Sequence, residues 1–123
     1  MERLIPTTIA RVYHNDPHMS INVRGKISFN RSASSELGIR AGSKVALVHR
    51  PNGDKVEFAV MKDDEGFRLM EYNKNGRIGF GAQSVVQVMR KLMDLPLDET
   101  KRKSIQFSLK KTKWEGKEVW KIV

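Results

Sequence analysis

The chain contains no cysteine, and it has few acidic residues relative to basic ones. The lack of cysteine excludes disulfides and thiolate metal sites. No apolar run is long enough to span a membrane, and the opening segment "MERLIPTTIARVYHNDP" lacks the apolar stretch of a signal peptide. We therefore expect a cytoplasmic protein that has no membrane partner.

Recognisable catalytic patterns are also missing. The sequence shows no nucleophile paired with a base, no paired acids in a glycine-framed loop and no phosphate-binding loop. His14, Asp16 and His18 share a short segment with Pro17, a composition more typical of a polar turn than of a metal site. We predict a protein that is not an enzyme and that holds no metal or cofactor.

What the chain does contain indicates one folded domain spanning residues 1–123. It has 123 residues, of which 39% are hydrophobic, enough for a modest core. Alternation of apolar and polar residues, with Asn-Gly turns at 52–53 and 75–76, predicts β-hairpins. The expected strands are about 7–13, 19–23, 26–29, 44–49, 55–61, 67–72, 77–80, 104–109 and 118–122, and the expected helices are 32–37 and about 82–92.

A short phrase occurs twice. "RGKISF" at 24–29 and "NGRIGF" at 75–80 share the pattern Gly-basic-Ile-x-Phe at an offset of 51 residues. Five matched positions can arise by chance, but the order strand, strand, helix, strand, strand also repeats. A ββαββ unit cannot bury its own apolar face. We predict a mainly β (α+β), barrel-like domain of two intertwined repeats, about 19–61 and 67–122, in which Ile27 superposes on Ile78 and Phe29 on Phe80.

The first repeat resembles a known family. The segment "GKISFNRSASSELGIRAGSKVAL" is similar to the AbrB-type swapped-hairpin domain of bacterial transition-state regulators and antitoxins. The positions in register are Gly25, Lys26, Ile27, Phe29, Leu37, Gly38, Ile39, Gly42 and Val45. The resemblance covers about a fifth of the chain, and it implies a swapped-hairpin fold that binds DNA.

The chain departs from the family pattern at several positions. Asn30 replaces the usual proline, Ser43 replaces the usual aspartate, and Ser34 and Ser35 stand where the family often has DNA-contacting arginines. The basic residue after each repeated glycine is retained. The resemblance therefore implies nucleic-acid contacts at Lys26 and Arg77.

Basic residues are the strongest functional signal, since the formal net charge is +9. Such an excess attracts polyanions. Two clusters flank the predicted strand 105–109, and Trp114 follows the second cluster. The candidate nucleic-acid-binding residues are Arg24, Lys26, Arg31, Arg77, Lys101, Arg102, Lys103, Lys110, Lys111, Lys113 and Trp114. Lysines would track phosphates without reading bases, and Trp114 would stack on a base.

Two functions from different classes follow. The first is a nucleic-acid-binding regulator or accessory factor, with DNA favoured over RNA, acting as a monomer or homodimer. The alternative is a structural or partner-binding module, such as an assembly component or a host-factor antagonist, whose charge serves solubility, an acidic protein partner or protection of an edge strand. An antitoxin is a weaker reading, because antitoxins of this fold usually add a disordered tail whereas this C-terminus is predicted to form strands.

Overall fold

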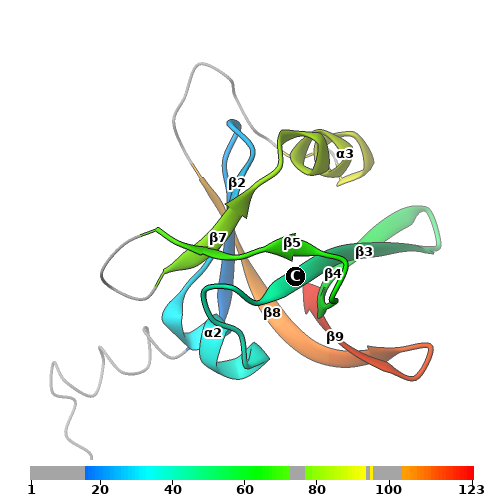
Figure 1. Ribbon diagram of the computed structural model, residues 1–123. Coiled ribbons are helices and arrows are strands. Elements are labelled where there is room, and N and C mark those ends of the chain that lie inside the picture. The colour runs from blue at the N-terminus through cyan, green and yellow to red at the C-terminus, as the bar shows by residue number, and fades with distance from the viewer. Residues whose placement is uncertain (1–15, 73–76, 94, 96–103) are drawn as a thin grey trace, which may run out of the picture.

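The computed structural model describes residues 16–72, 77–93, 95 and 104–123, which form one antiparallel sheet and two helices (Figure 1). The sheet has nine strands and curls into a nearly closed barrel. The mainly β, barrel-like fold with two helices is therefore confirmed. The elements are β1 (His18–Ile21), β2 (Lys26–Phe29), α2 (Arg31–Leu37), β3 (Lys44–Asn52), β4 (Lys55–Lys62), β5 (Phe67–Arg68), β6 (Met70–Glu71), β7 (Ile78–Gly81), α3 (Gln83–Met93), β8 (Ile105–Trp114) and β9 (Lys117–Ile122).

A single buried residue links the two ends of the sheet. The strand order is β5-β3-β4-β9-β8-β1-β2-β7-β6, so β5 and β6 lie at opposite ends of the list. Only Leu69 separates these two strands in the sequence, and its amide donates to the carbonyl of Ser43 at 2.8 Å. The chain thus passes directly from one end of the sheet to the other, which brings the ends together and surrounds a common core.

The repeated phrase lies on two strands that pair with each other. β2 and β7 are antiparallel, with Ile27 opposite Phe80 and Phe29 opposite Ile78, and all four side chains are buried. A two-fold axis that exchanged Ile27 with Ile78 and Phe29 with Phe80 would generate this register. The sheet order is likewise unchanged when β2 is exchanged with β7, β3 with β8, β4 with β9, and β1 with the β5–β6 pair. The pairing is the one that a pseudo-two-fold arrangement requires.

Local sequence explains how α2 begins and ends. Asn30 is its N-cap, and the side-chain oxygen accepts from the amide of Ala33 at 2.9 Å. The same oxygen accepts from the amide of His18, so the cap also holds the start of β1. Gly38 ends the helix with a φ of 67°, the left-handed conformation that glycine adopts at low cost.

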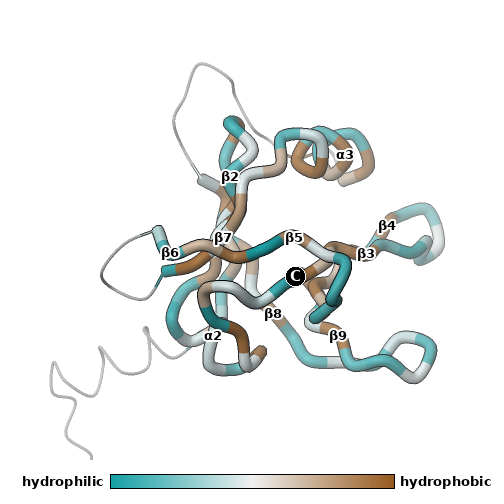
Figure 2. The backbone as a smooth tube through the Cα atoms, viewed as in Figure 1, coloured by the Kyte–Doolittle hydropathy of each residue, from teal (hydrophilic) through white to brown (hydrophobic). Residues whose placement is uncertain are grey.

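The sequence predicts a core of Ile27, Phe29, Leu37, Val45, Phe58, Phe80, Val88, Phe107 and Trp120, and this core is confirmed at most positions. The predicted residues that are buried are Ile27, Phe29, Leu37, Val45, Phe58, Phe80 and Trp120. Phe107 is half-buried and packs against this core. Figure 2 shows the polar turns of the β3–β4 and β8–β9 hairpins extending away from the hydrophobic strands.

The prediction for Val88 was wrong, because this side chain is 46% exposed. Helix α3 turns Val86 and Met89 into the core, with Val85 and Met93 half-buried beside them. Val88 lies on the opposite side of the helix. The sequence has valines and methionines at helical spacing on more than one side, and only contact with the barrel selects the buried face.

Gly25 is required by both conformation and packing, and this leads to a stability prediction. Its φ is +90°, and a Cβ at this position would lie 2.6 Å from the backbone of Gln83 at the start of α3. Gly53 also has a positive φ, but a Cβ there would meet nothing within 4 Å. Gly25→Ala should therefore cost about 2–5 kcal/mol, combining strain with displacement of α3, whereas Gly53→Ala should cost about 1–2 kcal/mol. Thermal melts of the two variants test the difference, and equal melting temperatures would contradict the tight contact.

Candidate nucleic-acid interface

Charge divides the described structure into two regions. Residues 17–35 and 77–93 contain no aspartate or glutamate, and pairing of β2 with β7 brings them side by side. We call them the acid-free region. Its cationic side chains are Arg24, Lys26, Arg31, Arg77, Arg90 and Lys91. Acidic residues occur at its borders, at Asp16, Glu36 and Glu71, and throughout the hairpins of the other half.

A trough crosses the outer surface of β7, β2 and β1, and Arg77 lies in it. The trough exists because small residues face one another across the strands: Gly79 opposite Ser28, and Ser28 opposite Ser20. Arg77 donates from Nε to Ser28 Oγ at 3.0 Å, and a second guanidinium nitrogen donates to Ser20 Oγ. Both serines are 5% exposed, so the guanidinium is held in a fixed position.

The depression around Arg77 is lined by polar and cationic side chains. It measures about 270 Å³, and its lining residues are Ser20, Asn22, Lys26, Ser28, Arg77, Ser104 and Gln106. Lys26 Nζ lies 4.2 Å from the centre of the Tyr72 ring, a cation–π contact that places the ammonium at the rim. Among the described residues, the lining consists of two cations, hydroxyls and amides and includes no carboxylate, and such a lining suits an anion.

A second depression lies between the β1–β2 turn and α3. It measures about 280 Å³ and is lined by Val23, Arg24, Gln83, Val86, Gln87 and Arg90. The carbonyl of Gly25 accepts from the amide of Ala82 at 2.7 Å, which fixes the turn against the start of the helix. Arginines from two separate elements therefore line one groove beside the two glutamines.

The three C-terminal lysines do not form one surface. β8 is a continuous strand through residues 110–113, so Lys110 points to the opposite face from Lys111 and Lys113. Lys111 is ion-paired with Glu118 at 2.7 Å, and this carboxylate belongs to the residue opposite Lys113. The structure therefore separates lysines that the sequence analysis grouped, and it places a carboxylate among them.

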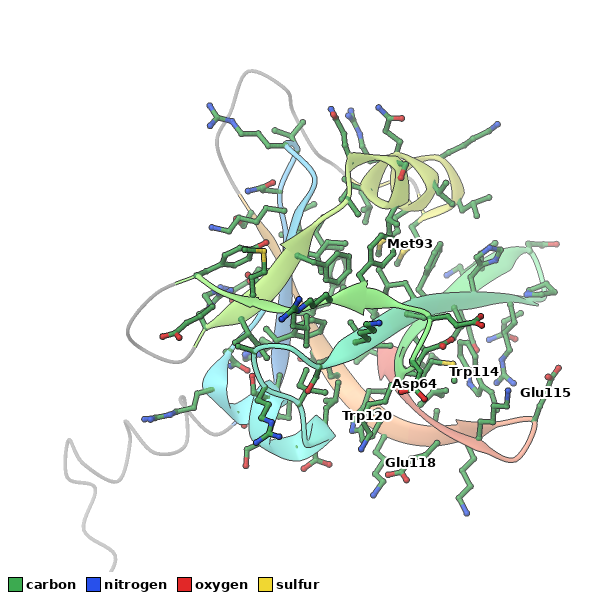
Figure 3. All side chains as sticks on the ribbon, in the orientation of Figure 1. Asp64, Met93, Trp114, Glu115, Glu118 and Trp120 are labelled. Carbon is green, nitrogen blue, oxygen red and sulfur yellow. The ribbon has the colours of Figure 1, made fainter. Side chains whose placement is uncertain are left out.

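Trp114 does not present an open ring face. Trp114, labelled in Figure 3, is 7% exposed and packs with Ala59 and Val119. The guanidinium of Arg50 covers the ring at 4.2 Å from its centre. Base stacking would require this arginine to move. Its placement supports a role in packing the β8–β9 hairpin against the β3–β4 hairpin. The predicted stacking of Trp114 on a base finds no support.

The other predicted residues divide between three locations. Arg24 lines the depression between the β1–β2 turn and α3, and Lys26 and Arg77 line the depression around Arg77. These two depressions are called the two grooves below. Arg31 lines a different depression of about 390 Å³ with Arg40 and Ser35. Lys101, Arg102 and Lys103 lie outside the described residues, as does His14.

Sequence analysis missed Arg90 and the polar residues of the grooves. These residues are Ser20, Asn22, Ser28, Gln83, Gln87, Ser104 and Gln106. One signal could have found most of them, because the absence of acidic residues from 17–35 and 77–93 is visible in the sequence. The dense lysine run at 110–113 instead lies close to two carboxylates, Glu115 and Glu118.

Glu57 joins the two hairpins, and its ionisation leads to a pH prediction. The side chain is 10% exposed and contacts Lys121 at 3.0 Å and Arg50 at 3.1 Å. Hydrogen bonds from Lys121, and then from Arg50, hold the pKa of Glu57 below its ordinary value. Because the folded-state pKa is lowered, the stabilisation is present above the unfolded-state pKa and is lost as pH falls through the folded-state value. Glu57→Gln should therefore lower the melting temperature at pH 7 but much less below pH 3, and an equal decrease at both pH values would contradict this origin.

Further features bear on other classes of function. Within the described residues, no three His, Cys, Asp or Glu side chains are grouped so that they could hold a metal ion. Neither described helix is long and apolar enough to cross a membrane. Comparisons with models of protein families, with curated proteins and with solved structures found no match to the chain.

Proposed function

We propose that this protein binds nucleic acid, with DNA favoured, through the phosphate backbone. The observation that carries the proposal is the acid-free region: six arginine and lysine side chains with no carboxylate between residues 17 and 35 or between 77 and 93. Four of them line two polar grooves beside the β1–β2 hairpin: Arg24 and Arg90 line one groove, and Lys26 and Arg77 line the other. Arginine, lysine, serine and amide side chains are the groups that contact phosphates in DNA complexes.

The simplest test measures binding to duplex and single-stranded oligonucleotides by fluorescence anisotropy over 50–200 mM salt. If the protein makes four to six phosphate contacts, raising the salt from 50 to 200 mM should reduce its affinity for duplex by about two to three decades. The reason is that each contact releases condensed counterions, which added salt opposes. Absence of binding at 50 mM salt would refute the proposal.

The resemblance to AbrB-type domains supports the same proposal. β2, α2 and the left-handed Gly38 occur in the order that the resemblance implies, and the two residues that it assigns to DNA contacts, Lys26 and Arg77, line one groove. We propose that the chain is an internally duplicated swapped-hairpin domain. The symmetric registers of β2 with β7 and of β4 with β9 support this origin.

Duplication leads to a prediction about assembly. An ancestral single copy would have needed a second chain to bury its apolar face, whereas this chain supplies both halves. Sedimentation equilibrium at micromolar concentration should therefore give the monomer mass of 14.1 kDa. A mass of about twice that value would show that the internal second half does not replace a partner chain.

One observation favours the alternative, a partner-binding module. Val88 and Leu92 are exposed on α3, and Met70 is 63% exposed on β6. Exposed apolar side chains of this kind are often found at protein interfaces. If binding to DNA is absent, this alternative becomes the better reading of the chain.

A further inference from the structure

The outward face of α3 has a composition that differs from the rest of the surface. Its exposed side chains form two rows with a spacing of four residues along the helix: Gln83, Gln87 and Lys91 in one row, and Ser84, Val88 and Leu92 in the other. The helix contains no acidic residue. Figure 1 places α3 on the outside of the barrel, and Figure 3 shows that side chains project from it away from the strands.

This composition matches the edges of base pairs. Glutamine can both donate to and accept from adenine, and arginine or lysine can donate to guanine. An apolar side chain such as Val88 can contact the methyl group of thymine. Val88 and Leu92 are exposed on α3, and the floor of a major groove offers apolar contacts beside polar ones.

The dimensions of the helix also fit. Eleven residues at 1.5 Å each give a length of about 16 Å. The major groove of B-DNA is about 12 Å wide and admits an α-helix. In contrast, duplex RNA has a deep, narrow major groove that side chains do not reach.

Neighbouring cations are placed to hold the backbone beside such a helix. Arg24, on the β1–β2 turn, lines the same groove as Gln83 and Gln87, and Arg90 contributes from the helix itself. The contact of Gly25 with the backbone of Gln83 keeps the turn at a constant distance from α3. A helix flanked by a rigidly attached arginine combines base contacts with a positioning contact to phosphate.

We propose that α3 is a recognition helix that enters the major groove of duplex DNA and gives this protein sequence preference. The proposal rests on the proposed function, since it assigns a duplex substrate and a reading element to the same protein. It changes the expectation from the lysine clusters, which predicted binding without base readout.

The test begins with selection of preferred sequences from a random duplex library by the full-length protein. The selected duplex should bind about 5- to 100-fold more tightly than a scrambled one at equal salt. Gln83→Ala combined with Gln87→Ala should reduce this ratio to within about twofold of one, while affinity for the scrambled duplex changes by less than about threefold. Both side chains are exposed, and circular dichroism melts should confirm that the variant is folded.

Gln106→Ala is the matched control. It removes the same amide from β8, where Gln106 lines the other groove. Because Gln106 lines a groove assigned to phosphate binding, this variant should weaken binding to the selected and scrambled duplexes by the same factor and keep the preference ratio of the parent. Val88→Ser provides a second variant, which should weaken selection only at thymine positions.

The possible failures are distinguishable. Lack of binding to any duplex at 50 mM salt would overturn both the proposed function and this inference. Binding without a selected sequence, a preference unchanged in the Gln83/Gln87 variant, or equal affinity for duplex RNA of the same sequence would overturn the role of α3 and leave backbone binding in place.

Discussion

Replacing Phe29 with alanine should lower the free energy of unfolding by about 3–5 kcal/mol, and the melting temperature by about 10–20 °C. Phe29 is fully buried on β2, opposite Met19 on one side and Ile78 on the other. Truncation would leave a cavity at the β2–β7 pair, and surrounding strands held by backbone hydrogen bonds cannot collapse into it. Urea or thermal unfolding followed by circular dichroism gives the measurement.

Phe107→Ala is the control for this prediction. Phe107 lies on β8 opposite Met19, so it occupies the same row of side chains, but it is only half-buried. The same truncation should therefore cost clearly less than at Phe29. If the two variants lose equal stability, the centre of the core does not lie at the β2–β7 pair.

Removing three cations from the acid-free region should reduce affinity for duplex DNA by about two to three decades at 0.1 M salt. The variant combines Arg24→Gln, Lys26→Gln and Lys91→Gln, all at exposed positions. Each lost phosphate contact should also flatten the log–log salt dependence by about 0.9, which gives a total change of about 2.7. Fluorescence anisotropy across a salt series measures both quantities.

A charge-matched variant separates this surface from the lysine surface predicted by the sequence. Lys110→Gln, Lys111→Gln and Lys113→Gln also lower the formal charge from +9 to +6. Because these lysines point to two faces and Glu118 neutralises one of them, this variant should retain nearly the parental affinity and salt dependence. The opposite result, with the larger loss in the β8 variant, would assign binding to the hairpin.

Several features of the fold were predictable because they depend on short-range rules. Alternation predicted the strands, Asn52-Gly53 predicted a hairpin turn, and the helix predicted over 32–37 is found as α2. The repeated phrase also indicated that residues 25–29 and 76–80 play equivalent parts, and the described portions of both lie on paired strands. Each of these signals involves neighbouring residues, whose conformational preferences are expressed locally.

The candidate site was less predictable, because it depends on which side chains share a face. Lys110 and Lys111 are adjacent in the sequence but point apart, since neighbouring side chains in a strand alternate. Trp114 was predicted to stack on a base, but the fold places Arg50, which lies 64 residues earlier in the sequence, over its ring. Arg77 and Ser20 are 57 residues apart and meet only because β7, β2 and β1 lie side by side.

The sequence by itself determined the class of fold, the places where strands and helices begin, and the excess of positive charge. Composition, residue spacing and turn chemistry carry this information without reference to distant parts of the chain. Tertiary structure alone decided which face of α3 is buried, which cations share a groove and which lysines are neutralised by carboxylates. These outcomes follow from long-range strand pairing, because closing the barrel brings residues 17–35 against 77–93 and leaves the outward row Gln83, Gln87 and Lys91 exposed to solvent.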